Sequence, residues 1–298
     1  MRPGLAAAAL AITLLAPASA SAFCRTRTKG VAANYDAVEN GCSLEGLPLF
    51  WRNACVGYSI AAAGSKKISY EEASNNISLA FTRWTGASCH ADEQGRSRPS
   101  IDVRDLGPVE CAKIEFHSNV PNQNVILFRD DNWEHPPEVL GLTTVNYSPS
   151  NGEIFGADME INTYGMDPLA VRDPVGEKEY DFLSVATHEA GHFLGMGHSD
   201  VKSSTMYASY KAGQTVQRVL TDDDIEGICS IYRPDGKRSV LNDFVAAAPQ
   251  CDPTPKGGYT HECYEKPDCA IGRGQSGTRT TALGLAGLAV LLRLRRRR

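Results

Sequence analysis

The chain has 298 residues and a formal net charge of −5, and 42% of its residues are hydrophobic. Arg2 and the five arginines within 293–298 make up six of the 30 basic residues. Removal of both ends would leave 24 basic against 35 acidic residues, a net charge of about −11. An acidic surface disfavours nucleic acid and anionic lipid as partners, and it suits an exported protein.

The first 22 residues are predicted to be a secretory signal peptide. Arg2 gives a positive start, residues 5–15 are apolar but too few to span a membrane, and small residues before Ser21 and Phe23 offer cleavage sites. A short segment at 23–44 is expected next. The stretch 45–233 is long enough to form one domain with a sizeable core.

Apolar periodicity and turn residues predict the elements of this domain. Strands are expected at 54–61, 109–116, 124–128, 141–147 and 153–162. Helices are expected at 69–84, where Ser69 and Glu72 can form a capping box, at 180–194, and from Thr221 onward. The predicted fold class is α/β, a twisted mixed sheet of about five strands with three main helices.

Residues 188–198 read H-E-x-x-H-x-x-G-x-x-H. His188 and His192 are four residues apart, so a helix projects both from one face toward one metal ion. Glu189 can then contact a water on that metal, while Gly195 can turn the chain and return His198 as a third ligand. Three protein ligands leave one position of a zinc ion open for water, which is typical of catalytic sites. The alternative is a structural helix whose histidines are satisfied by hydrogen bonds.

Downstream of these histidines, the stretch 204–210 and Ser199 resemble the metzincin clan, and within it the matrixin-like peptidases. The resemblance assigns Met206 to the tight turn beneath the zinc and 220–228 to the last helix of the catalytic domain. It also implies a metzincin-like (zincin) fold, and it places Tyr210 at the pocket for the substrate side chain that follows the cleaved bond. Ala208 stands where many matrixins have proline.

The sequence departs from many matrixins at the structural zinc site. Thr143 and Thr144 occupy the strand where histidine is expected, and no histidine lies between His135 and His188. We therefore expect one catalytic zinc and no structural zinc. Calcium is a second candidate cofactor. Asp130 and Asp131 could bind it, although a solvated acidic loop is the simpler interpretation.

These features predict a zinc-dependent endopeptidase with Glu189 as general base and acid. Its partner would be a protein or peptide substrate, paired along strand 141–147 or strand 153–162. Two alternatives stay open. One is a catalytically idle surface binding protein on the same fold, and the other is a zinc hydrolase of non-peptide amides or esters.

The C-terminal part is predicted to contain a linker or stalk at 234–268 and a tail at 269–298. The apolar stretch 280–292 precedes an arginine cluster, which indicates a membrane anchor with the arginines on the cytoplasmic side. The arrangement resembles myxobacterial surface-sorting tails that are cut near a cysteine, here Cys269. We expect contact with the membrane only through this tail, and a location at the cell surface or outer membrane, or outside the cell.

Nine cysteines in an exported chain predict disulfides. Eight of them would allow 105 connectivities, so sequence alone does not choose. Local pairing favours Cys24 with Cys42 and Cys251 with Cys263. The other four would then form bridges within the domain: Cys55, Cys89, Cys111 and Cys229.

Overall fold

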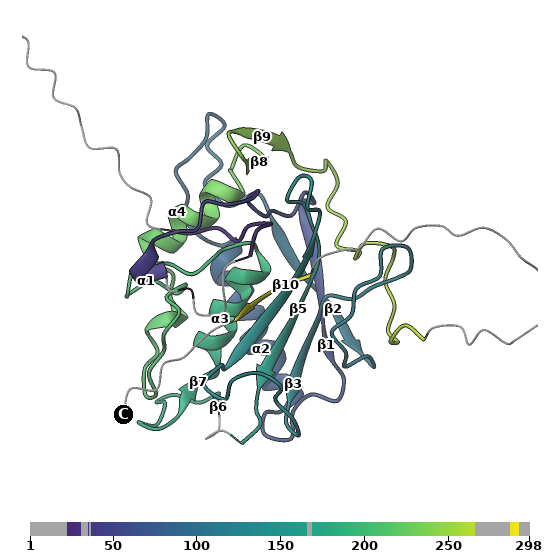
Figure 1. Ribbon diagram of the computed structural model, residues 1–298, viewed down its shortest axis with the longest axis vertical. Coiled ribbons are helices and arrows are strands. Elements are labelled where there is room, and N and C mark those ends of the chain that lie inside the picture. Colours follow the sequence, from purple (N-terminus) through teal and green to yellow (C-terminus); the bar gives the residue numbers. More distant parts are fainter. Residues whose placement is uncertain (1–22, 31–34, 36, 166–168, 266–286, 292–298) are drawn as a thin grey trace, which may run out of the picture.

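The computed structural model describes residues 23–30, 35, 37–165, 169–265 and 287–291 (Figure 1). Its centre is a mixed sheet in the order β10-β4-β5-β3-β1-β2. The strands are β1 (Cys55–Ala61), β2 (Asp102–Val109), β3 (Val125–Arg129), β4 (Gly141–Tyr147), β5 (Ile154–Asn162) and β10 (Gly287–Leu291). β4 runs antiparallel to β5 and to β10, whereas the other pairs are parallel.

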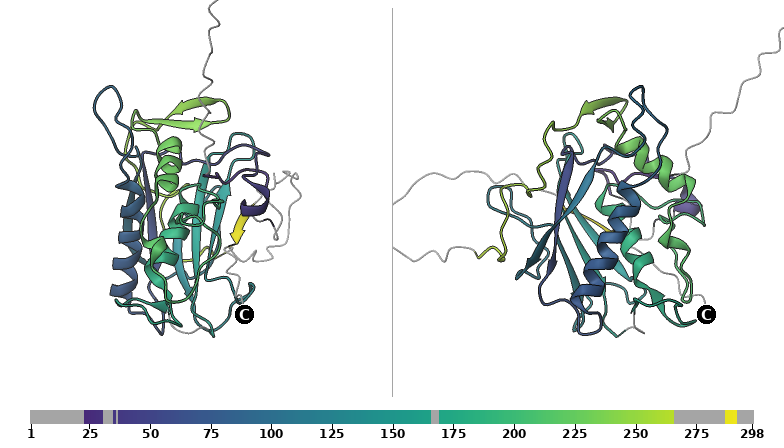
Figure 2. Two further views of the ribbon diagram at one scale, coloured as in Figure 1. Left: turned by 90° about the vertical axis from the view of Figure 1, so that its left-hand side faces the viewer. Right: turned by 180° about the vertical axis from the view of Figure 1, so that it is seen from behind.

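Helices α2 and α3 lie side by side on one face of the sheet, and α4 lies beyond α3 (Figure 2). The helices are α1 (Ala37–Asn40), α2 (Tyr70–Thr85), α3 (Phe182–Phe193), the short 3-10 helix η1 (Val216–Arg218) and α4 (Asp222–Ile231). Two small ribbons complete the described part, formed by β6 (Leu169–Ala170) with β7 (Tyr180–Asp181) and by β8 (Lys237–Val240) with β9 (Asp243–Ala246).

The predicted fold class is confirmed: β1 to β5 form the mixed sheet and α2, α3 and α4 are the main helices. The capping box of α2 is also confirmed. Glu72 N donates to Ser69 Oγ at 3.2 Å, and Ser69 N donates to Glu72 Oε2 at 3.1 Å. These bonds satisfy amides that the first helical turn leaves without a partner, and they fix where α2 begins.

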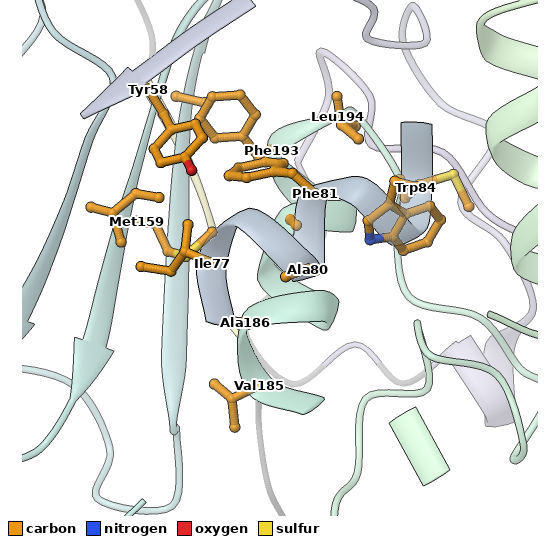
Figure 3. Packing of buried hydrophobic residues seen from close by; sticks show 14 of the residues in the cluster. Tyr58, Ile77, Ala80, Phe81, Trp84, Met159, Val185, Ala186, Phe193 and Leu194 are labelled. Carbon is orange, nitrogen blue, oxygen red and sulfur yellow. The ribbon is translucent and has the colours of Figure 1, made fainter. Parts of the chain in front are cut away.

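Aromatic side chains between the sheet and the helices set the position of α3 (Figure 3). The ring of Phe81 from α2 stacks on Tyr58 of β1 with centroids 4.8 Å apart, and it meets Phe193 of α3 edge-on at 5.0 Å. Trp84 is fully buried and donates its indole N–H to the Thr187 carbonyl at 2.7 Å. Because α2 and α3 share both apolar and polar contacts, α3 is held rigidly against the sheet.

The strand predicted at 109–116 is wrong in position, because β2 ends at Val109. The apolar residues of the predicted segment instead cover the outer face of the sheet, which is the face away from α2 and α3. Ile114 packs against a cluster there, and Phe116 lies directly over Gly156. β2 itself is an edge strand with largely exposed polar residues, so it lacks the apolar alternation of a buried strand.

The predicted Cys24–Cys42 bridge is confirmed, but the Cys251–Cys263 bridge is wrong. The disulfides are Cys24–Cys42, Cys55–Cys251, Cys89–Cys229 and Cys111–Cys263. Residues 247–265, here called the C-terminal arm, cross the outer face of the sheet, where Tyr259 Oη lies 3.0 Å from Ser59 Oγ. Each of the two cysteines of the arm is therefore bonded to a cysteine at the sheet, and the two are not bonded to each other. This arm and the β8–β9 ribbon make up most of the described part of the expected linker.

The predicted signal peptide and most of the predicted tail, including Cys269, lie outside the described residues. The described piece of the tail, Gly287–Leu291, is strand β10. Among the residues that the structure describes, no helix has the length and apolar character that a membrane span requires.

Replacing Cys111 and Cys263 together by serine should loosen the C-terminal arm while the rest of the domain stays folded. Local opening of the arm would expose its backbone, so trypsin should cut after the exposed Lys256 faster by on the order of tenfold. Mass spectrometry of timed digests measures this rate. The control replaces Cys24 and Cys42, which bridge a different segment. Equal rates in both double variants would show that the Cys111–Cys263 bridge does not hold the arm.

Candidate metal centre

Three imidazoles converge at the C-terminal end of α3. His188 and His192 lie one turn apart on this helix, and their Nε2 atoms are 3.0 Å apart. His198 follows the helix after a turn, and its Nε2 lies 3.1 Å from that of His192. The structure thus brings all three sequence-predicted ligands together. Among the described residues, they are the one group of potential metal-ligand atoms that contains no disulfide-bonded cysteine.

Backbone carbonyls decide which ring nitrogens face one another. His188 Nδ1 lies 2.7 Å from the Thr205 carbonyl, and His192 Nδ1 lies 2.9 Å from the Met196 carbonyl. A carbonyl only accepts, so each Nδ1 carries the proton and each Nε2 presents a lone pair. Zinc binds imidazole nitrogen at about 2.0–2.1 Å, which in a tetrahedral site places ligand atoms about 3.3 Å apart. The residues present therefore fit a zinc ion.

Burial keeps these imidazoles neutral. It lowers the pKa of His192 to about 4, and it lowers the pKa values of His188 and His198 well below the ordinary value, with the neighbouring histidines adding to the effect. Metal ligation requires the neutral imidazole, so protons do not compete for the site near pH 7.

The turn that returns His198 is held by the N-terminal segment of the chain. Gly195 takes a φ of +91°, which lets the chain reverse directly after α3. Thr26 N donates to the Gly195 carbonyl at 2.9 Å, and Thr26 Oγ1 donates to the Met196 carbonyl at 2.7 Å. Gly197 N donates to the Cys24 carbonyl at 2.8 Å. Sequence reasoning missed this support because no local pattern links residues about 170 positions apart.

Met206 lies in a tight turn packed against α3. Its sulfur and the ring of Trp84 fill the space at Gly191, so a side chain there would overlap both. Ser199 N donates to the Met206 carbonyl at 2.9 Å, which ties this turn to the residue after His198. The structure thus places Met206 in a turn against α3, and its position beneath a metal stays a prediction of the resemblance.

Asp224 of α4 organises the same turn and was not singled out from the sequence. This fully buried carboxylate accepts hydrogen bonds from the amides of Thr205 at 2.8 Å, Met206 at 3.1 Å and Thr221 at 2.8 Å. The Thr205 carbonyl in turn accepts a hydrogen bond from His188 Nδ1. Asp224 therefore links the start of α4 to the orientation of one imidazole, as outer groups often do for metal ligands.

Glu189 follows His188 on α3 and is fully buried. Its Oε2 accepts a hydrogen bond from Thr143 Oγ1 of β4 at 2.7 Å, while Oε1 is buried without a protein partner among the described residues. Burial raises the pKa of Glu189 to about 8, and the Thr143 hydrogen bond opposes this shift. A carboxyl with such a pKa can accept and return protons near neutral pH.

Tyr210 lies on the segment between the Met206 turn and η1. Its ring packs against Tyr180 just before α3, with centroids 5.9 Å apart, and its hydroxyl donates to the Gln214 carbonyl. Burial raises the pKa of Tyr210 to about 12. Arg218 of η1 pairs with the buried Asp181 at 2.7 Å, so this segment is fastened to the N-terminus of α3.

The candidate calcium ligands Asp130 and Asp131 are engaged by the chain itself. Asp130 accepts hydrogen bonds from Ser65 Oγ at 2.8 Å and from Lys66 N at 2.7 Å. Lys66 Nζ forms an ion pair with Asp131 at 2.5 Å. An ammonium group thus pairs with one of the two carboxylates of this loop, and neutral donors bind the other.

Comparisons with known proteins agree with this geometry. The Matrixin family matches residues 110–233. Matrilysin of Rattus norvegicus is 52% identical over 61 residues, which are 20% of this chain and 22% of the relative. Metalloendoproteinase 1-MMP of Arabidopsis thaliana is 39% identical over 101 residues, 33% of this chain and 26% of the relative. Metalloendoproteinase 4-MMP of the same plant is 36% identical over 108 residues, 36% of this chain and 30% of the relative.

The chain thus spans between 22% and 30% of the length of these three relatives. The region that the family matches, residues 110–233, includes β3, β4, β5, α3 and α4. It also contains the three histidines of the imidazole cluster and Glu189. Residues 110–233 of this chain therefore resemble a matrixin domain of the metzincin clan.

The His198→Ala variant should lose zinc, because two imidazoles on one helix do not close a tetrahedral site. Wild-type protein should hold one zinc per chain after dialysis, and the variant should bind zinc at least about a hundredfold more weakly. Elemental analysis and chelator competition measure both quantities. His90→Ala, at an exposed histidine, is the control. Unchanged zinc content in His198→Ala would remove this residue from the ligand set.

Proposed function

We propose that this protein is a zinc-dependent endopeptidase. The observation that carries the proposal is the convergence of three imidazole nitrogens, together with a buried Oε1 of Glu189 that has no protein partner among the described residues. A surface binding protein has no use for a buried carboxylate oxygen without a partner, since burial of an unpaired polar atom is costly. The ligands are His188, His192 and His198, and zinc is the one cofactor proposed.

Zinc held by the three imidazoles would supply Lewis acidity to a water and to the scissile carbonyl. Glu189 Oε1 would accept a proton from the attacking water and deliver it to the leaving amine. Thr143 would hold Oε2, so the carboxylate stays aimed in one direction during both transfers. Met206 would support α3 through the packing of its side chain against Gly191.

The edge of β4 is proposed as the binding site for an extended peptide. β5 is paired on both sides, with β4 and β3, so the alternative strand at 153–162 offers no free edge. The other edge of β4 pairs with β10 in antiparallel register, which indicates that it accepts an extended strand. An extended backbone site favours peptide over small amide or ester substrates. Tyr210 is proposed to line the pocket beyond the cleaved bond.

Export and surface attachment are proposed from the ends of the chain. The signal peptide at 1–22 would direct secretion, and the tail at 269–298 would anchor the protein until it is cut near Cys269. The four disulfides of the described part support an oxidising location outside the cytoplasm. Loss of the tail would also remove β10 from β4.

Replacing Glu189 by alanine should lower kcat/KM for a peptide substrate by roughly 10²–10⁴-fold, because the proton carrier is lost while three zinc ligands remain. Cleavage of a peptide library, read by mass spectrometry, measures turnover and bond type together. Glu226→Ala on the exposed side of α4 is the control. Activity of Glu189→Ala within a few-fold of the control would contradict the assignment of the base.

Deleting residues 287–298 should raise kcat/KM about threefold or more, mainly through a lower KM, because β10 no longer competes for the edge of β4. The matched control deletes only 292–298, which removes the arginines and retains β10. Equal KM values for the two truncated proteins would show that β10 does not occupy the substrate edge in solution.

A further inference from the structure

Two residues of β4 surround the carboxylate of Glu189. Gly141 and Thr143 are two positions apart on the strand, so both point toward the same face, where α3 lies. Thr143 is fully buried, and its hydroxyl donates to Glu189 Oε2 at 2.7 Å. This contact joins residues 46 positions apart.

Gly141 is needed for space. A Cβ atom at this position would lie 2.8 Å from both Cγ and Oε1 of Glu189 and 2.9 Å from its Cδ. These separations are too short for carbon beside a carboxylate, so any larger residue would push the side chain of Glu189 aside. Gly141 thus leaves room for the carboxylate, and Thr143 fixes its orientation.

The two oxygens of Glu189 are therefore not equivalent. Oε2 is held by Thr143, whereas Oε1 has no protein partner among the described residues and is the atom left to meet a water. A hydroxyl on a strand suits this task because a β-branched side chain has few rotamers and loses little freedom when it is fixed. The hydroxyl also belongs to the strand whose outer edge is the proposed peptide site.

We propose that Gly141 and Thr143 are positioning residues that hold the general base Glu189 with Oε1 facing the substrate water, an inference that rests on the proposed peptidase function. Neither residue touches substrate atoms through its side chain in this role. They act by limiting the carboxylate to one orientation, which transition-state proton transfer requires.

The decisive comparison is among Thr143→Val, Thr143→Ser and Thr82→Val. Valine keeps the shape of threonine but cannot donate, so Thr143→Val should lower kcat by roughly 10- to 100-fold with KM within about threefold and one zinc per chain. Thr143→Ser retains the hydroxyl and should recover kcat to within about threefold of wild type. Thr82, an exposed threonine of α2 whose hydroxyl donates to the Ser78 carbonyl of the same helix, supplies the control, and Thr82→Val should leave kcat unchanged.

A second measurement separates this inference from the proposed function. In zinc-free protein, Thr143→Val should lower the urea midpoint of unfolding, because it leaves Oε2 buried without a donor. In a Glu189→Ala background the same substitution should lower the midpoint less, since the carboxylate acceptor is gone and only the backbone carbonyl of residue 189, 3.2 Å from Thr143 Oγ1, remains. Suppose that the wild-type protein cleaves no peptide, yet Thr143→Val lowers the urea midpoint more when Glu189 is present than when it is replaced. That result would refute the peptidase function and leave the Thr143–Glu189 contact intact.

Two results would overturn the inference itself. One is a kcat of Thr143→Val equal to that of Thr82→Val in an active enzyme. The other is equal kcat loss in Thr143→Ser and Thr143→Val, because that pattern reflects packing and not the hydroxyl. Gly141→Ala adds an independent check. It should lower kcat at least as much as Thr143→Val while zinc stays bound, since the added Cβ displaces the carboxylate.

Discussion

The close approach of three neutral imidazoles in a buried space is the constraint on which the rest of this structure depends. Their Nε2 atoms lie 3.0 and 3.1 Å apart, and the Nδ1 contacts of His188 and His192 leave the Nε2 lone pairs of these two rings directed inward. A bound cation would stabilise that arrangement, and a rigid surround keeps it in place. Many features of the domain can be understood as parts of this surround.

Helix α3 is buried along its whole length, so each side of it is contacted by a different part of the chain. Trp84 bonds to its backbone from α2, and Thr143 bonds to Glu189 from β4. The Thr205 carbonyl orients His188, while Thr26 secures the turn that leads to His198. A helix fixed from several directions can hold ligands within the narrow tolerance that metal geometry demands.

β4 connects this centre to the proposed substrate. One side of the strand carries Gly141 and Thr143 against Glu189, and its outer backbone edge pairs with β10. The same strand thus defines where an extended chain lies and where the carboxylate points. The strand that aligns the peptide would then also hold the carboxylate that transfers the proton.

Local patterns in the sequence were sufficient to predict much of the fold. The capping box at Ser69 located α2, the histidine spacing located α3, and the turn residues at 149–152 separated β4 from β5. These signals depend on residues a few positions apart, where helix and strand periodicity act directly. The three imidazoles and their nearby carboxylate could be assigned for the same reason.

Tertiary structure decided the features that depend on distant contacts. The partners of Cys251 and Cys263 lie 196 and 152 positions away, and the apolar residues after Val109 cover the outer face of the sheet instead of extending a strand. The hydrogen bond from Thr143 to Glu189 likewise exists only once β4 lies against α3. Sequence determined which groups are the candidates for the chemistry, while packing decided how each is oriented, because orientation arises from neighbours that no local periodicity encodes.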